Sequence, residues 1–179
     1  MLGRLALLPA LERPDLLAGA VVRALQAWPH AGRAQVAEID ADLADTAAFC
    51  AAYDVPLGAS ANCVVVAGKR GEDLRYAACV VLATTRADVN GLVRKRLDAR
   101  KASFAPREQT VDATGMEFGG ITPVGLPAGW PVLVDAAVTT AGLIVVGSGL
   151  RRSKLVLPGE LLGALPGAEV LEGLGQAGS

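Results

Sequence analysis

Histidine is almost missing from this sequence. Its single representative, His30, lies in the segment Trp28-Pro29-His30-Ala31. A metal site built from several histidines is therefore excluded, and any Ser–His or Cys–His catalytic pair would depend on this one loop residue. We interpret His30 as a surface residue of a turn, and we expect no metal and no other cofactor.

Cysteine is also scarce. The three residues Cys50, Cys63 and Cys79 form neither a CxxC motif nor an even-numbered framework. This usage fits reduced thiols in a cytosol. Cys63 and Cys79 lie within apolar runs rich in β-branched residues, which favours small buried side chains over reactive thiols.

Long apolar runs are lacking as well. The longest nearly uncharged stretch, residues 127–150, is interrupted by glycine, proline and Asp135, so it makes a poor transmembrane span. The run Leu5–Leu8 is too short for a signal peptide and ends at Pro9. We therefore expect a cytoplasmic protein that does not contact a membrane.

The residues that are present describe an ordinary globular chain. Of the 179 residues, 52% are apolar and 20% are charged, which fits one domain spanning residues 1–179. Aromatic residues make up only 4%, so the core must be mainly aliphatic. The sequence contains no repeats and no visible domain boundary.

Charge is unevenly distributed although the net charge is only −1. Acidic residues are in excess over the first 60 residues, whereas residues 86–107 and 151–154 are strongly basic. The basic residues of these two segments are Arg86, Arg94, Lys95, Arg96, Arg100, Lys101, Arg107, Arg151, Arg152 and Lys154. Phosphate binding needs such a local positive surface rather than a high overall pI. A solvated helix face is the other interpretation of the same run.

Periodicity and turn residues indicate alternating helices and strands. Helices are expected over residues 15–28, about 42–53, 84–97 and 107–114, with a final helical turn at 160–165. Strands are expected at residues 34–39, 62–67, 75–82, 132–135, 143–147, 151–157 and 168–171. Residues 62–67 and 75–82 should form a hairpin around the polar connector 68–74, with at least one arm buried on both faces. Residues 173–179 are expected to be a frayed tail.

One stretch, Thr114–Pro127, places four glycines and two prolines within fourteen residues. Glycine permits positive φ angles and close approach of the backbone to another group, while proline fixes φ and removes an N–H. The loop should therefore have a defined shape. It is either a tight connection between two elements or a surface whose backbone groups meet a ligand.

The order of motifs around this loop resembles the YbaK/EbsC family of aminoacyl-tRNA deacylases, which is similar to the editing domain inserted in bacterial prolyl-tRNA synthetases. The resemblance spans about residues 42–171. It rests on the hairpin, the basic helix, Lys-Ala-Ser-Phe-Ala, the segment Thr-Gly-Met-Glu-Phe-Gly-Gly-Ile-Thr-Pro-Val-Gly-Leu-Pro, and the downstream Val-Asp and Gly-Ser-Gly. It implies a single compact α/β (α+β) domain with a mixed, mostly antiparallel, barrel-like sheet flanked by helices.

The resemblance also implies an activity and a site. The family hydrolyses the ester that links a wrong amino acid to the 3′-terminal adenosine of tRNA, and its catalysis is attributed to positioning and backbone dipoles. By this resemblance, catalysis falls to Gly119, Gly120 and Asn62. The pocket residues would be Met116, Phe118, Ile121, Thr122, Pro123, Gly125, Asp135, Ser148 and Gly149. Contacts to tRNA phosphates would come from Arg94, Lys95, Arg100, Lys101, Arg151, Arg152 and Lys154.

One residue departs from the family pattern. The family usually has a lysine at the start of the first hairpin strand, and Asn62 stands there in this chain. Asparagine can donate a hydrogen bond but carries no charge, and charged hydrogen bonds are about twice as strong as neutral ones. Lys101 and Lys69 are the lysines that we consider as spatial substitutes.

Three functions are consistent with these observations. The first is a freestanding, monomeric trans-editing hydrolase that acts on the aminoacyl end of tRNA, with an aminoacyl-tRNA synthetase as a candidate partner. The second is a catalytically weak or inactive module of the same fold that binds tRNA or a small ligand. The third, an unrelated enzyme with a phosphate-binding glycine loop, is disfavoured because residues 115–125 match neither GxGxxG nor a Walker motif.

Overall fold

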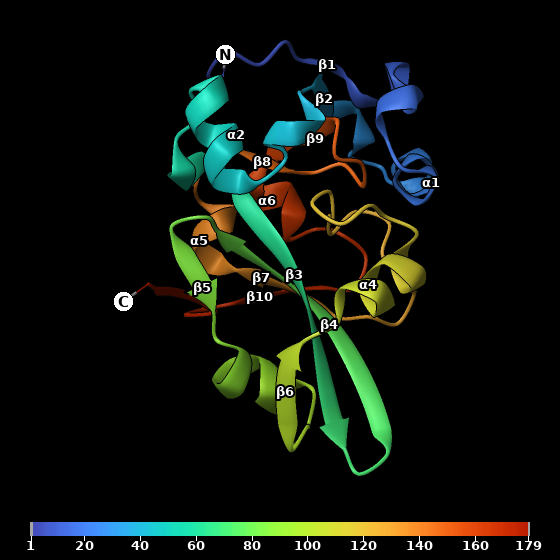
Figure 1. The fold of residues 1–179 in the computed structure, drawn as a ribbon, viewed down its shortest axis with the longest axis vertical. Helices are drawn as coiled ribbons and strands as arrows, with labels where there is room; N and C mark the ends of the chain where they lie inside the picture. The colour runs from blue at the N-terminus through green and yellow to red at the C-terminus, as the bar shows by residue number, and fades with distance from the viewer. Residues whose placement is uncertain (1, 179) are drawn as a thin grey trace.

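A long β-hairpin crosses most of the molecule in the structure, a computed structural model that describes residues 2–178 (Figure 1). Its arms are β3 (Ala61–Arg70) and β4 (Asp73–Leu82), paired from Ala61 opposite Leu82 to Arg70 opposite Asp73. The predicted hairpin is confirmed, but its connector is much shorter than expected. The polar residues on both sides of Gly71 belong to the two paired strands, which remain hydrogen-bonded up to the turn. Gly71 takes the positive φ of 63° that this tight turn requires.

The hairpin forms the centre of a five-stranded sheet in the order β10-β7-β4-β3-β6. The added strands are β6 (Lys101–Phe104), β7 (Val132–Asp135) and β10 (Ala168–Leu171). β7 runs parallel to β4 and β10 runs parallel to β7, while the other pairs are antiparallel. Residues 77–81 of β4 are all buried, which confirms that one arm is covered on both faces.

A second, antiparallel sheet has the order β1-β2-β9-β8. Its strands are β1 (Leu8–Pro9), β2 (Gln35–Glu38), β8 (Leu143–Gly147) and β9 (Ser153–Pro158). A single bridge from Ser60 to Val145 joins it to the start of β3. Both sheets are open among the described residues, so the mixed α/β architecture is confirmed and the barrel-like closure is wrong.

Helices flank these sheets. The α-helices are α1 (Gly19–Ala27), α2 (Thr46–Tyr53), α3 (Arg94–Arg96), α4 (Arg107–Thr114), α5 (Ala136–Thr139) and α6 (Gly159–Leu162). Shorter 3₁₀ turns are η1 (Ala10–Glu12), η2 (Pro14–Leu16), η3 (Ala31–Arg33), η4 (Ala41–Leu43) and η5 (Leu57–Ala59), and η6 (Val89–Val93) is a π-helical turn. Within residues 2–178, no helix is long and apolar enough to cross a membrane.

Two sequence-based helix boundaries are corrected by tertiary contacts. The first helix begins at Gly19 rather than Asp15, because Leu17 is extended and the N–H of Ala18 donates to the carbonyl of Ser148. The helix expected from residue 84 begins only at Val89, since Thr85–Ala87 form strand β5.

The partner of β5 is β11 (Gly175–Ala177), so the middle of the expected frayed tail is an ordered strand. Leu174, just before β11, is completely buried. Burial of this leucine and the backbone pairing together hold the segment in place. Only Ser179 of the expected tail lies outside the described residues.

The core is aliphatic, as the composition predicts. Its largest cluster includes Val21, Leu25, Val134, Ile144 and Leu155 and fills the space between α1 and the two sheets. A second cluster lies on the other face of β4, and a third packs α2 against β8 and β9. The two sheets thus stack through side chains that were recognisable as apolar runs in the sequence.

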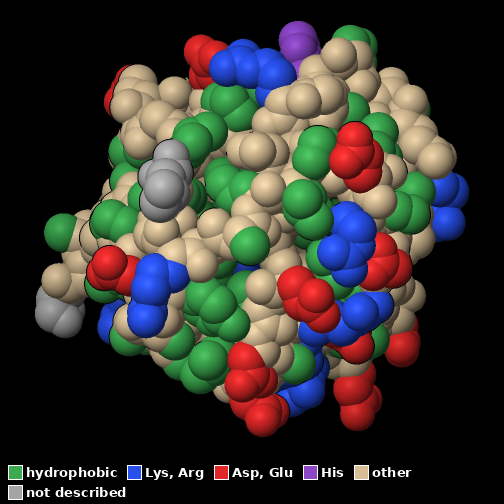
Figure 2. Space-filling model, turned by 90° about the horizontal axis from the view of Figure 1, so that it is seen from above, with side chains coloured by type: hydrophobic (Ala, Val, Ile, Leu, Met, Phe, Trp, Pro, Cys, Tyr) green, Lys and Arg blue, Asp and Glu red, His purple; other side chains and the backbone are tan. Residues whose placement is uncertain are grey.

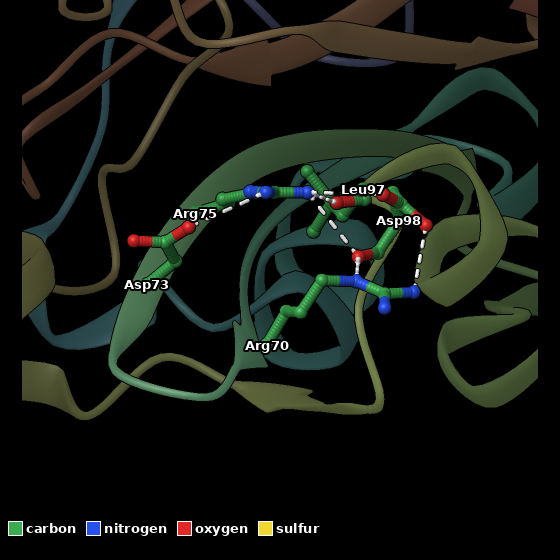
Figure 3. A network of polar contacts seen from close by, with 5 residues as sticks. All are labelled: Arg70, Asp73, Arg75, Leu97 and Asp98. Carbon is green, nitrogen blue, oxygen red and sulfur yellow. Dashed lines mark hydrogen bonds and ion pairs between the residues drawn. The ribbon is translucent and has the colours of Figure 1, made fainter.

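Polar contacts fasten the distal end of the hairpin (Figure 3). Arg70 donates to the carbonyl of Asp98 at 2.7 Å and to its carboxylate at 2.8 Å, and Arg75 donates to the carbonyl of Leu97 at 2.8 Å. Arg75 also lies 3.6 Å from the carboxylate of Asp73. These two arginines are therefore occupied within the protein, and the turn after α3 is attached to the hairpin.

The opposite end of the molecule has a mixed surface. Viewed from above, the end that carries the N-terminus, α2 and β1 shows acidic and basic side chains interspersed with apolar ones (Figure 2). Among the residues that the structure describes, this end shows no extended patch of one charge.

Candidate active site at the base of the hairpin

A pocket of about 550 Å³ lies where the start of β3 meets the loop before α2, the segment after β6 and the glycine loop. The apolar and small residues that line it are Ala44, Ala61, Cys63, Val64, Val65, Phe104, Ala105, Phe118, Gly119, Ile121 and Gly147. The polar and charged ones are Asp45, Thr46, Asn62, Arg107, Thr110 and Lys154. A mainly apolar wall with a few convergent polar groups is typical of a ligand site.

Asn62 lies in this pocket and is held in one orientation. The Oγ1 atom of Thr46, the first residue of α2, donates a hydrogen bond of 2.6 Å to Oδ1 of Asn62. Since the amide oxygen is engaged, the two N–H groups of the same amide are directed to other acceptors. Asn62 can thus present hydrogen-bond donors to a carbonyl or phosphate in the pocket.

The glycine loop supplies the opposite wall. Phe118, Gly119 and Ile121 line the pocket, and the guanidinium carbon of Arg107 lies 4.5 Å from the ring centroid of Phe118. Gly119 has a φ of 93°, and its N–H donates to no acceptor among residues 2–178. This backbone group is available to a substrate oxygen, as a ligand-binding interpretation of the loop requires.

Other loop residues form the support behind this wall. Gly120 is buried, its N–H donates to Glu117 and its carbonyl accepts from the N–H of Gly149 at 2.6 Å. A Cβ on Gly120 would lie 2.7 Å from the backbone of Leu150. Both polar groups of Gly120 are therefore occupied, and its role is the close approach of two backbone segments rather than direct contact with a substrate.

Five more of the expected substrate contacts lie away from the pocket. Met116 and Thr122 are fully buried, and Ser148 is buried with its hydroxyl bonded to Leu150 and Ser153. Gly149 packs against Ala18. Asp135 is only 3% exposed and its carboxylate lies beside Gly175 in the β5–β11 region. The structure gives these residues packing roles around the site.

Pro123 and Gly125 line a different cavity, also about 550 Å³, between α1 and β7. Its walls include Trp28, Trp130 and the rest of the loop to Pro131. The long glycine-rich stretch thus divides into two parts. Phe118, Gly119 and Ile121 face the pocket beside Asn62, while residues 123–127 face the second cavity.

Lys154 is the largest departure from the expected arrangement. Instead of reaching tRNA phosphates from the surface, it is buried on β9 and lines the pocket. Its Nζ donates to the carbonyl of Ala44 at 2.9 Å and lies 5.2 Å from the ring centroid of Phe49. Burial lowers the pKa of the Lys154 ammonium, while nearby Cys50 and Asp45 oppose that shift.

The other members of the second basic segment also make internal contacts. Arg151 donates to the carbonyls of Phe118 at 3.2 Å and Ala41 at 3.1 Å, so it ties the glycine loop to η4. Arg152 donates to the carbonyl of Asp15. The expected basic knot at residues 151–154 is therefore largely a structural clamp, because backbone carbonyls of neighbouring loops accept its N–H groups.

A basic groove lies next to the pocket, along β6. It is lined by Lys69, Arg94, Arg100 and Lys101, and Phe104 lines both the groove and the pocket. No carboxylate of residues 2–178 lies within ion-pair distance of these four basic side chains. Phe104 is 62% exposed although it is a large apolar residue. Lys95, on α3, is exposed outside the groove lining.

Neither Lys69 nor Lys101 can replace a cation beside Asn62. Lys69 and Lys101 are opposite each other in the backbone register of β3 and β6, and Lys69 lies seven residues after Asn62 along β3. At roughly 3.3 Å per residue, this separation is about 23 Å. Both belong to the groove rather than to the pocket.

Cys63 also lines the pocket but is a poor nucleophile. Burial raises the pKa of its thiol far above the ordinary value, and the neighbouring Cys79 adds to the shift. The thiolate is the reactive form of cysteine, so Cys63 is protonated and unreactive near neutral pH. Among residues 2–178, no cluster of three histidine, cysteine, aspartate or glutamate side chains forms a metal site.

Sequence reasoning missed Thr46, Phe104 and the true position of Lys154. Thr46 follows Asp45 at a predicted helix start, but its contact with Asn62 joins residues sixteen apart. Phe104 had a usable signal, because a large apolar residue between Ser103 and Pro106 in a basic segment is typical of a surface that meets a nucleic acid. Nothing local marks Lys154, since both of its neighbours on β9 are also buried.

Comparison with known proteins supports the architecture and identifies the family. A protein described as a candidate trans-editing enzyme for prolyl-tRNA synthetase superposes with a TM-score of 0.72 at 22% identity, covering 90% of this chain and 99% of the other. A scaffold protein used for epitope backbone grafting gives a TM-score of 0.74 at 22% identity, covering 90% and 97%. At these identities the two structures share the fold. No curated protein matches the chain.

The sequence itself matches the model of the aminoacyl-tRNA editing domain over residues 40–164, more than half of the chain. The chain therefore belongs to the aminoacyl-tRNA editing domain family. The resemblance to YbaK-type proteins, inferred from the hairpin, the glycine loop and the Gly-Ser-Gly turn, is confirmed.

Proposed function

We propose that this protein is a trans-editing hydrolase that removes wrongly attached amino acids from tRNA by cleaving the ester at the 3′-terminal adenosine. The observation that carries the proposal is the junction of two surfaces at Phe104. One side is a pocket with the amide of Asn62 and the free N–H of Gly119, and the other is a groove with four basic side chains that form no ion pair within residues 2–178. An ester at the end of a polyanion needs both surfaces.

The groove fits the single-stranded end of a tRNA. Lys69, Arg94, Arg100 and Lys101 can neutralise backbone phosphates, and such contacts make binding strongly dependent on salt. The exposed ring of Phe104 can stack on a base, which contributes about 1–3 kcal/mol in comparable proteins. A strand held in this way would deliver its 3′ end to the pocket.

In the pocket, positioning is the main source of catalysis. The ester carbonyl would accept hydrogen bonds from the amide of Asn62 and the N–H of Gly119, while Phe118 and Ile121 exclude bulk water. Fixed donors of this kind typically contribute about 10²–10³ in rate, which is substantial for an ester that is already activated. The single histidine takes no part, since His30 lies in the turn after α1, where it contacts Trp28 edge to face.

The absence of charge on Asn62 favours a second candidate function. A pocket that holds the aminoacyl end without accelerating hydrolysis would make the protein a binding module for tRNA or for a small ligand. We place the protein in the cytoplasm in either case, because charged tRNA is made and used there.

A hydrolysis assay separates the two. The protein is incubated with a panel of mischarged tRNAs, and loss of the ester is compared with that for Asn62→Ala and for Arg33→Ala, a surface control that lines neither cavity. Turnover that is reduced at least tenfold in Asn62→Ala and unchanged in Arg33→Ala supports the hydrolase. Absence of turnover on every tRNA, with binding retained, establishes the binding module instead.

The substitution Asn62→Lys tests how asparagine is used. We expect it to lower activity, because a second ammonium in a pocket that already holds Lys154 is repelled and loses the amide contact to Thr46. An increase in activity would show that replacement of the family lysine by asparagine reduced the activity of this protein.

A further inference from the structure

Lys154 is a buried cation without a counter-ion. Its residue is 6% exposed, and its Nζ makes one hydrogen bond, to the carbonyl of Ala44. No carboxylate within residues 2–178 lies within ion-pair distance of it. The ammonium has three N–H donors, so its hydrogen-bonding capacity exceeds what the protein supplies.

Stability does not account for this arrangement. Removing an ammonium from water costs several kcal/mol even after the surroundings relax, and an apolar side chain of similar volume is often neutral or stabilising at such a site. A carbonyl and the face of Phe49 offset only part of that cost. An unpaired buried charge that lines a cavity is therefore more consistent with a functional group than with a packing residue.

Lys154 lines the same pocket as Asn62 and Gly119, the two residues proposed to bind the substrate carbonyl. Lys154 enters the pocket from β9, opposite Gly147, while Asn62 enters from β3 and Gly119 from the glycine loop. The carbonyl of Ala44 holds the ammonium at the wall formed by the start of α2. Three residues that carry donor groups, from three separate elements, thus line one cavity.

We propose that the ammonium of Lys154 stabilises the negative charge that develops on the ester carbonyl oxygen during deacylation. This inference rests on the proposed function. The oxygen of a water molecule forms a bond to the carbonyl carbon, and the π electrons of the carbonyl move onto its oxygen. The bond from that carbon to the 3′ oxygen of the adenosine then breaks. The 3′ oxygen gains the proton that the water loses, which yields a free amino acid and a 3′ hydroxyl.

In this scheme Lys154 neither gives nor takes a proton; it acts through its charge. The groups that face it are Cys50 and Asp45 from the α2 side, which favour the charged form, and Arg151, which opposes it. Activity should consequently decline at alkaline pH as the ammonium loses its proton. An arginine at this position would remain charged throughout the same range.

The experiment compares Lys154→Met and Lys154→Arg with the wild-type protein and with Arg33→Met, which removes a surface cation far from the pocket. Initial rates of ester loss from a mischarged tRNA are measured from pH 6 to pH 10, after subtraction of spontaneous hydrolysis. We expect kcat to fall about 100-fold or more in Lys154→Met, with KM changed less than about threefold. Arg33→Met should match the wild type.

The outcomes separate the two proposals. A wild-type protein that hydrolyses no mischarged tRNA overturns both the proposed function and this inference. A wild-type protein that is active, with Lys154→Met within threefold of it, overturns the role of Lys154 alone. If Lys154→Met does not fold, the test is the change in rate at alkaline pH in the wild type and in Lys154→Arg. A decline in the wild type that is absent from Lys154→Arg supports the inference, and an identical decline in both proteins overturns it.

Discussion

Thr46 donates a hydrogen bond of 2.6 Å from its Oγ1 to Oδ1 of Asn62, which joins the first turn of α2 to the start of β3. This contact determines whether the amide oxygen or the amide N–H groups of Asn62 face the pocket. Because the oxygen is occupied by Thr46, the donors of Asn62 are presented to a ligand. An amide that could rotate would spend part of its time presenting an acceptor to a substrate carbonyl, which is unfavourable.

The substitution Thr46→Val removes the donor while keeping the shape of the side chain. A hydrogen bond of this kind contributes about 1 kcal/mol, so we expect kcat/KM for deacylation to fall about fivefold. Thr46→Ser keeps the hydroxyl and serves as the matched control. If both variants behave like the wild type, Asn62 is oriented by something other than Thr46.

Close contact between the glycine loop and the end of β8 predicts a large loss of stability for Gly147→Ala. A Cβ on Gly147 would overlap the carbonyl oxygen of Ile121 and lie 2.6 Å from that of Gly120. Since these are backbone atoms, the loop must shift, and we expect the free energy of unfolding to drop by about 2–3 kcal/mol. Chemical denaturation measures the change. Gly58→Ala is the control, since a Cβ on Gly58 meets nothing within 4 Å.

The basic groove predicts a defined response to salt. Each phosphate contact with a single strand contributes a slope of about −0.7 in a plot of log affinity against log salt concentration. The double variant Arg100→Ala/Lys101→Ala should therefore reduce the slope by about 1.4, as measured by tRNA binding at several salt concentrations. Phe104→Leu should weaken binding without changing the slope, because stacking releases no counter-ions. A slope unaffected by the double variant would place the phosphates elsewhere.

Alkaline pH should destabilise the fold through Cys79. Burial raises the pKa of this thiol from 9.0 to about 12 in the folded state. The folded protein thus keeps a proton that the unfolded chain releases. The contribution to stability is complete below pH 9.0 and is lost at up to about 1.4 kcal/mol per pH unit as the pH rises towards 12. Denaturation of the wild type and of Cys79→Ala at pH 8 and pH 11 measures the difference.

The comparison with Cys79→Ala is needed because Lys154 titrates in the same range with the opposite sign. Burial lowers the pKa of the Lys154 ammonium in the folded state. Between that lowered pKa and pH 10.5, the unfolded chain keeps a proton that the folded protein has released. The stability of the fold therefore rises with pH over this range through Lys154. That contribution is common to the wild type and to Cys79→Ala and cancels between them. An equal loss of stability in both proteins between pH 8 and pH 11 would contradict the role assigned to Cys79.

Much of the local structure could be predicted because it depends on neighbouring residues. The hairpin, helix α4 at Arg107–Thr114 and strands β7 and β8 follow from apolar runs between turn residues, and the structure has them at the expected places. The aliphatic core follows from composition alone. The glycine loop was recognisable as a shaped segment next to a basic stretch, although not its division between two cavities.

The features that failed to follow from the sequence all depend on contacts between distant residues. The pairing of β5 with β11 unites segments about ninety residues apart and converts an expected frayed end into a strand. The carboxylate of Asp135 lies beside Gly175 in the β5–β11 region, although the family resemblance made Asp135 an expected pocket residue. In each case a partner elsewhere in the chain, not the local pattern, decides which way the side chain is directed.

The sequence by itself therefore determined the family, the hairpin and the exclusion of a metal site built from several histidines, because motifs, periodicity and composition are local or additive properties. Only the tertiary structure decided which polar groups meet in the pocket. It placed Thr46 against Asn62, and it buried Lys154, which charge patterning assigns to the surface, among apolar neighbours at the pocket wall. Burial and orientation are set by packing between elements, and packing has no signature in the residues that flank a lysine.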